Sequence, residues 1–297
     1  MQTPSRKYQK TDAAVVDYGY QVLEGCSFAV RGPLPLSPDG RNIVCLGSAA
    51  TFGRFARQPF PARVAARLGV NVVNLGFGGA RPETYLKEPA TLQLCRQSDL
   101  VILELMSARS YASDLFQPLN HLTGLGKLGP KYAKMIRKLK PNSPLLEEDV
   151  FVNRVGGWAA KNLGWEELND LKRQLLANYR RDAIQLICEI GRPVLLLWLS
   201  QRSMDQIAEP GSRISWDCGF PHFVDRETVE AIRAHAIGLV EVESKLGVPS
   251  TLTSMATGEL AAVLRGPTPH LNSYYPSPEM HEQAALQISD FLTQFLV

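Results

Sequence analysis

The sequence predicts an α/β protein whose core is a doubly wound parallel sheet, and three observations lead to this prediction. Apolar runs with the length of buried strands lie at residues 42–46, 70–75 and 100–105. The first two runs are each followed by a turn of small residues. Helical patterns follow these turns, and strand, turn and helix repeating in this order are typical of parallel strands with helices on both faces. We therefore expect a three-layer α/β/α arrangement.

Later segments extend the same pattern. Residues 165–190 form a long amphipathic stretch that ends at a glycine, as expected of a helix. The most apolar run of the chain, residues 193–199, follows and predicts another buried strand. Residues 224–246 predict a helix with Asp225 at its N-cap. Residues 282–296 predict a closing helix.

The alternation of predicted strands and helices stops at residues 111–163. We expect residues 1–297 to form one domain, in which residues 111–163 are a helical insertion that lies over the strand ends as a lid. Residues 127–140 carry six basic side chains and no acidic one. This basic stretch has two interpretations: it attracts an anionic substrate or partner, or it is the solvated face of a helix.

Composition argues against several classes of protein. The net charge of +3 is too small to indicate nucleic-acid binding. The chain has no run of about 18 apolar residues that could span a bilayer and no apolar segment of the signal-peptide kind near residue 1, so we expect a cytoplasmic protein without a membrane partner. Five cysteines without a CxxC pair indicate reduced thiols rather than disulfides or a metal site.

The stretch IVCLGSAATFG, residues 43–53, is the strongest candidate for a functional site. It joins a predicted strand to a predicted helix, and α/β proteins bind ligands at the carboxyl ends of their strands. A second small-residue turn, GFGG at residues 76–79, would lie at the same edge of the sheet. Its spacing does not fit the GxGxxG pattern of dinucleotide sites, so we expect no cofactor.

Three segments resemble the SGNH or GDSL-type hydrolases and acyltransferases. IVCLGSAATFG resembles the first block of that family, in which a strand ends in Gly-x-Ser-x-Thr-x-Gly. NLGFGG resembles the second block, and PSPEMHEQAA resembles the last, in which a histidine stands just before the final helix. The segments DYG, RGP, PFPA and FVDRETVEAIRAHA resemble an uncharacterised bacterial branch. The resemblance implies an SGNH/flavodoxin-like fold.

The resemblance also implies a reaction and the residues that perform it. An esterase or acyltransferase of small or saccharide esters is the implied activity. The backbone amides of residue 49 and Gly79, with the side chain of Ser110, would face an oxyanion, and His281 would move the proton. The positions expected to contact the substrate are Gly47, Thr51, Gly78, Arg81, Ser107 and Arg109.

The chain departs from the family pattern at three places. Ala49 occupies the position of the nucleophilic serine, and a methyl group cannot attack a carbonyl carbon, while Ser48 is one residue away. The oxyanion-binding asparagine falls on Ala108 or Ser110, depending on register. The aspartate expected three residues before the histidine is replaced by Pro278.

These departures leave a second interpretation, a degenerate hydrolase that binds an anionic ligand through Arg109, Arg81 and the small-residue turns. Arg109 supplies a fixed positive charge suited to a carboxylate, phosphate or sulfate, unless an acid at the sheet edge neutralises it. Transfer of sulfate or phosphate is a third interpretation, without a Walker-type loop to support it. Further candidates to line the cleft are His222, His270 and Asn272.

Overall fold

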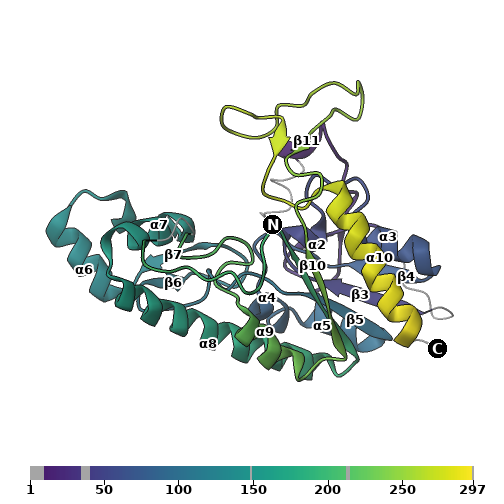
Figure 1. Ribbon diagram of the computed structural model, residues 1–297, viewed down its shortest axis with the longest axis horizontal. Helices are drawn as coiled ribbons and strands as arrows, with labels where there is room; N and C mark the ends of the chain where they lie inside the picture. The colour runs from purple at the N-terminus through teal and green to yellow at the C-terminus, as the bar shows by residue number, and fades with distance from the viewer. Residues whose placement is uncertain (1–9, 35–40, 148, 212–214, 296–297) are drawn as a thin grey trace.

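The computed structural model describes residues 10–34, 41–147, 149–211 and 215–295. Within these residues, five parallel strands form the central sheet (Figure 1). Their order across the sheet is β10 (Gly238–Glu243), β9 (Val194–Ser200), β5 (Leu100–Glu104), β3 (Asn42–Leu46) and β4 (Asn71–Asn74). The chain starts near the middle with β3 and winds outward in both directions, which confirms the predicted doubly wound sheet.

Helices cover both faces of this sheet, because successive strand residues face opposite sides. Ile43 and Ile102 belong to one face, and Val44 and Trp198 belong to the other. The first face packs against α3 (Phe60–Leu68) and α10 (Pro278–Phe295). The second packs against α4 (Pro82–Leu86), α5 (Pro89–Gln97), α8 (Trp165–Ile190) and α9 (Arg226–Arg233). The predicted three layers are therefore present.

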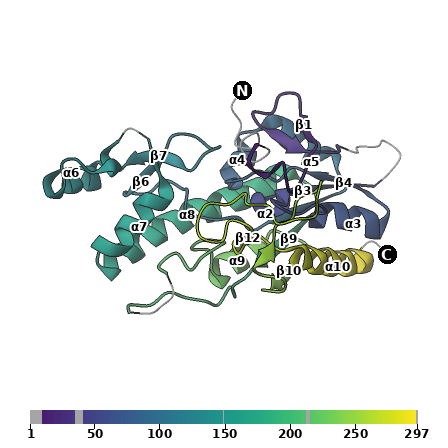
Figure 2. The same cartoon turned by 90° about the horizontal axis from the view of Figure 1, so that it is seen from above.

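Residues 116–162 form an arm that extends away from the sheet, as Figures 1 and 2 both show. Its strands, all antiparallel, are β6 (Phe116–Pro118), β7 (Leu125–Leu128) and β8 (Val150–Phe151). Its helices are α6 (Pro130–Leu139), a 3-10 turn (Pro144–Leu146) and α7 (Val152–Asn162). The prediction of a helical insertion is therefore only partly right, because β7 pairs with a strand on either side.

The predicted helix over residues 224–246 is two elements. α9 ends at Arg233, and the chain then turns into β10. Asp225 caps α9 as predicted, since its carboxylate accepts a hydrogen bond from Thr228 N at 3.1 Å. β10 replaces the rest of the helix because it pairs with β9 along its whole length, which buries Val240 and Val242 in the sheet.

The remaining elements are short. A hairpin-like pair, β1 (Tyr20–Val22) and β2 (Ala29–Arg31), precedes the sheet, and a second pair, β11 (Ser250–Thr251) and β12 (Leu271–Asn272), precedes α10. The closing helix begins four residues earlier than predicted, and residue 296 lies outside the described residues. In the part of the chain that the structure describes, no helix is long and apolar enough to cross a membrane.

Candidate functional site

The turn after β3 is built around Glu104, the last residue of β5. The Glu104 side chain is buried, and its carboxylate accepts hydrogen bonds from Ser48 N at 3.0 Å, Ser48 Oγ at 2.6 Å and Thr51 N at 2.8 Å. The Thr51 hydroxyl donates to the same carboxylate. A Cβ atom at Gly47 would overlap Glu104 and Thr51, so this position needs glycine. Burial raises the pKa of Glu104, although the hydrogen bonds from Ser48 and Thr51 act in the opposite direction.

Ser48 and Ala49 do not form a nucleophilic site in this turn. Ser48 is the N-cap of α2 (Ala49–Phe52), and its Oγ accepts a hydrogen bond from Ala50 N at 3.3 Å while donating to Glu104. The side chain is 5% exposed and has little access to a substrate. Ala49 is the first residue of the helix and presents only a methyl group. Thr51 is fully buried, so it too holds the turn rather than contacting a ligand.

The turn after β4 lies against the first turn. Asn74 Nδ2 donates to Thr51 O at 2.8 Å, and Asn74 Oδ1 accepts from Gly76 N at 2.9 Å. Gly78 is half-buried and Gly79 is exposed. Gly79 has a φ of 89°, in the left-handed region that favours glycine. Both glycines therefore lie in a turn at the carboxyl edge of the sheet, as predicted.

Arg81 is paired and buried, so the expectation that it contacts an anionic ligand is not met. Its Nε donates to the Glu83 carboxylate at 2.8 Å, and its Nη2 donates to Asn120 O at 2.9 Å. The guanidinium also lies over the Tyr111 ring, 5.6 Å from its centroid. Glu83 supplies the negative charge that a ligand would otherwise supply.

His281 lies one turn inside the closing helix rather than in the loop before it, because α10 begins at Pro278. The imidazole is 0% exposed, and its Nδ1 accepts a hydrogen bond from Phe60 N, the first residue of α3, at 3.2 Å. Burial lowers the pKa of His281 to about 3, and Arg31 and Arg63 act in the same direction. The prediction that His281 moves a proton for a substrate is therefore wrong, since its ring is enclosed between helices.

A polar cluster forms where the loop after β5 meets the loop after β9. Ser107 Oγ lies 3.1 Å from His222 Nδ1, and Arg109 Nη1 lies 3.1 Å from His222 Nε2. The backbone joins the same two loops, because Ala108 N donates to His222 O at 3.1 Å. Ser110 is half-buried next to the cluster, and a Cβ atom at Gly124 of the arm would lie 3.8 Å from its Oγ.

The neighbours of His222 determine where its proton lies. A guanidinium only donates, so Arg109 requires His222 Nε2 to accept, and the proton is then on Nδ1, which donates to Ser107 Oγ. Burial lowers the pKa of His222 to about 3, with Arg109 and Arg202 acting in the same direction and Asp217 in the opposite one. A neutral histidine with both nitrogens engaged does not activate Ser107 as a nucleophile. It orients Arg109.

The side chain of Arg109 is half-buried. Among the residues that the structure describes, no carboxylate forms an ion pair with its guanidinium. Asp217 is nearby, but its Oδ2 is 3.7 Å from His222 Nε2, and its Oδ1 accepts from Ser215 Oγ at 2.6 Å. The phenol of Tyr274 also lies next to Arg109.

Arg202 holds the loop that carries His222. Its guanidinium is buried and donates to the backbone oxygens of Ser203, Pro221 and Val224. It also lies over the indole ring of Trp198 on β9, 4.9 Å from the ring centroid. The loop is therefore fixed to the strand it follows, so the position of His222 against Arg109 is set before any ligand binds.

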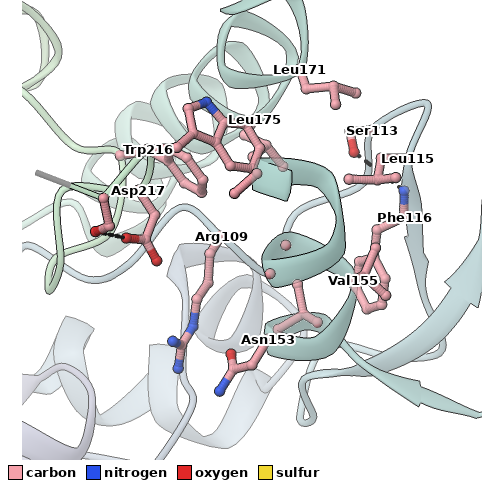
Figure 3. Close-up of a pocket in the computed structure, with 16 residues that line it drawn as sticks. Arg109, Ser113, Leu115, Phe116, Asn153, Val155, Leu171, Leu175, Trp216 and Asp217 are labelled. Atoms are coloured by element: carbon pink, nitrogen blue, oxygen red, sulfur yellow. Dashed lines mark hydrogen bonds between the residues drawn. The ribbon is translucent and has the colours of Figure 1, made fainter. Parts of the chain in front are cut away.

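A cavity of about 340 Å³ lies next to this cluster, between α7, α8 and the two loops. Polar side chains in its wall are Arg109, Ser113, Asn153, Ser215 and Asp217. Figure 3 shows the Arg109 guanidinium and the Asn153 amide directed to the same side of the cavity. Most of the wall is apolar, and consists of Leu115, Phe116, Val152, Val155, Leu171, Leu175, Trp216 and Phe223.

The structure thus brings together only part of the predicted site. Ser107, Arg109 and His222 meet, whereas Ser48 and His281 are enclosed elsewhere. Sequence reasoning missed Glu104 in the first turn and the cavity residues Asn153, Trp216 and Asp217. Asp217 could have been found, since it lies in a loop after a predicted strand, but nothing in the sequence places the arm residue Asn153 next to Arg109.

The structure also places the remaining candidate residues and the basic stretch. Asn272 is buried and organises its own loop, donating to Ser250 Oγ at 3.2 Å. His270 is half-buried. In the basic stretch, Lys131 pairs with Glu167 of α8 at 2.9 Å. No group of three His, Cys, Asp or Glu side chains that could hold a metal occurs among the described residues.

In the comparison with known protein families, the model of a family of unknown function matches most of the chain. A family model described as "Domain of unknown function (DUF6473)" matches residues 6–117 and 162–296. The chain belongs to the DUF6473 family. The search among curated proteins found no match.

Solved structures similar to this DUF6473 chain include three hydrolases. A phospholipase A1 from Streptomyces albidoflavus is 12% identical, with 84% of this chain and 99% of that chain covered and a TM-score of 0.45. A lipase/acylhydrolase from Enterococcus faecalis is 15% identical, with 85% and 95% covered and a TM-score of 0.43. A carbohydrate esterase family 2 enzyme with its carbohydrate-binding domain, from Corynascus thermopiles (Myceliophthora fergusii), is 10% identical, with 89% and 69% covered and a TM-score of 0.44.

The DUF6473 match omits residues 118–161, which are nearly the whole arm. The cavity therefore has walls of two kinds. Arg109, Trp216 and Asp217 belong to the matched parts, whereas Asn153 and the apolar face of α7 belong to the unmatched segment.

Proposed function

We propose that this DUF6473 protein binds a small anionic molecule at the carboxyl edge of its sheet, and that Arg109 contacts the negative charge. The observation that carries the proposal is the half-buried guanidinium of Arg109, which has a neutral histidine as its partner and no carboxylate ion pair within the described residues. Holding a charge partly out of water without an ion pair is costly, and a bound anion lowers that cost.

The surroundings of Arg109 favour this role. His222 occupies one Nη atom, and the guanidinium has further donors for the two oxygens of a carboxylate or the oxygens of a sulfate. Because Arg202 and the Ala108 backbone hold His222 in place, Arg109 is oriented in the free protein. Preorganised donors lose less side-chain freedom on binding.

The esterase or acyltransferase of small or saccharide esters implied by the sequence resemblance is the alternative. Its support is the three sequence blocks. Against it stand two observations: Ala49 presents a methyl group at the position of the nucleophile, and the imidazole expected to act as the base, that of His281, is enclosed.

Substituting Arg109 tests the binding proposal directly. We expect Arg109→Gln to weaken the binding of acetate and sulfate by about tenfold or more, because the hydrogen bonds to a charged donor are lost. Arg109→Lys keeps the charge but loses the planar pair of donors, so we expect an intermediate loss. Isothermal titration calorimetry at constant ionic strength measures both.

The matched control is Arg137→Gln, which removes the same charge from the exposed face of α6. Affinity for both anions should not change in this variant. Equal losses in the two glutamine variants would mean that net charge, rather than a site at Arg109, attracts the anions, and the proposal would fail.

Substituting Ala49 separates binding from ester chemistry. We expect Ala49→Ser to show no burst of nitrophenol from p-nitrophenyl acetate, because His281, the histidine that the family pattern pairs with such a serine, is enclosed and bonded to Phe60 N. Stopped-flow absorbance measures the burst. A burst with the stoichiometry of the protein would support the esterase alternative and count against a purely binding role.

A further inference from the structure

We infer that the ligand is a monocarboxylate with an apolar tail, and that the tail lies in the cavity beside α7, against Gly156. The inference rests on the proposed function, since it takes Arg109 as the contact for the charge. It adds the chemical class of the ligand and a residue that determines how much tail the site accepts.

The cavity suits the apolar part of such a ligand. Its volume of about 340 Å³ falls in the range typical of small-molecule sites. Leu171 and Leu175 of α8, Val155 of α7 and Trp216 of the loop belong to its apolar wall, and Figure 3 shows them together with Arg109. An apolar tail that enters this space leaves water, which is the main source of affinity for such groups.

The charges in the wall favour a single negative charge on the ligand. Arg109 is positive and Asp217 is negative, and both line the same cavity. A dianion such as sulfate carries a second charge that Asp217 repels and that one guanidinium does not offset, so we expect sulfate to bind more weakly than a monocarboxylate with an apolar tail. The exposed amide of Asn153 is directed to the same side as Arg109 and can donate to the carboxylate.

Gly156, in helix α7 of the arm, leaves space in the cavity for the tail of the ligand. It lies in the interior of α7, where glycine is less favourable than alanine because it leaves more backbone freedom to lose. A Cβ atom at Gly156 would meet no heavy atom within 4 Å, so the packing of the helix does not require glycine. Gly156 is half-buried and lines the cavity. The missing side chain therefore adds to the space for the tail.

The first test is a series of carboxylates of increasing length, acetate, butanoate, hexanoate and octanoate, titrated calorimetrically into the wild-type chain. We expect Kd to fall by about fourfold for each added methylene group until the cavity is full. An equal Kd across the series would overturn the inference, while acetate binding that depends on Arg109 would still support the proposed function. If no carboxylate in the series bound, both the inference and the proposed function would be overturned.

The second test is Gly156→Ala. We expect octanoate to bind about tenfold more weakly, because the new methyl group takes space from the tail. Acetate, which has the same charged group without the tail, should change by less than about twofold. The midpoint of urea unfolding should stay the same or rise, since alanine suits a helix better. Unchanged octanoate affinity in this variant would overturn the role of Gly156.

Discussion

Glu104 places a carboxyl group in the interior, where amide and hydroxyl groups of Ser48 and Thr51 surround it. Burial raises its pKa above the ordinary value for glutamate, although the hydrogen bonds from Ser48 and Thr51 act in the opposite direction. The stability that this group contributes is fully present below its ordinary pKa and is lost as the pH rises through its raised pKa.

We expect Glu104→Gln to become more stable relative to wild type as the pH rises from about 4.5, because a neutral amide escapes the cost of an ionised carboxyl. Its oxygen can keep the donors from Ser48 N and Thr51 N. Glu104→Ala should instead lose about 3 kcal/mol, since those donors are left without a partner. Urea unfolding across this pH range measures both, and a pH-independent difference between Gln and wild type would contradict the expected titration.

At the scale of single residues, the sequence predicted the chemistry of a side chain better than its surroundings. Arg109 was expected to be available to an anion, and among the described residues no carboxylate forms an ion pair with it. Ser48, Arg81 and His281 were expected at the site as well, but their neighbours decide otherwise. The partner of His281 is Phe60, 221 residues away in the chain, and that of Ser48 is Glu104, 56 residues away. No local pattern reveals such pairs.

At the scale of elements, length and periodicity predicted most of the sheet. α8 has the bounds expected from its amphipathic pattern, Trp165–Ile190, and the buried strands fall within two residues of the apolar runs. β10 was missed because no proline separates it from α9, although Gly238 at its first residue is a signal that a helix can end there. Pairing with β9 decides its conformation, and pairing is not visible in a single segment.

The start of α10 shows how one element changes the meaning of a motif. Pro278 suits the first turn of a helix, where its missing N–H leaves no hydrogen bond unmade. The helix therefore begins three residues before His281, and the residues directly before it are Pro276 and Ser277. His281 therefore lies about one turn inside the helix, whereas the sequence block predicted it just before the helix. In this position its ring is buried in the core.

For the whole molecule, two enclosed histidines from distant parts of the chain predict acid sensitivity. Burial is the main cause that lowers the pKa of His222 and of His281 to about 3. Unfolding exposes both rings, and each then binds a proton below its ordinary pKa of about 6.5. The unfolded state therefore holds more protons than the folded state between about pH 3 and pH 6.5, and stability falls as the pH falls through that window.

We expect each of these histidines to contribute a slope of up to about 1.4 kcal/mol per pH unit to the free energy of unfolding. His281→Asn keeps an acceptor for Phe60 N and removes the titrating group, so it should remove one of the two contributions. Urea unfolding between about pH 7 and pH 5 measures the slope. His235→Asn, at an exposed position, is the control, and a slope in His281→Asn equal to that of wild type would contradict the expectation.

The arm leaves the sheet after β5 and returns through α8, so its strands form no part of the central hydrogen-bonded ladder. Its residues can therefore change without altering the register of the parallel strands. An exchange of this segment between related chains would replace Gly156 and the α7 side of the cavity, and so change the length of the tail that is accepted, while Arg109 would stay in place. The residue that contacts the charge and the residue that limits the tail thus lie in separable parts of one polypeptide.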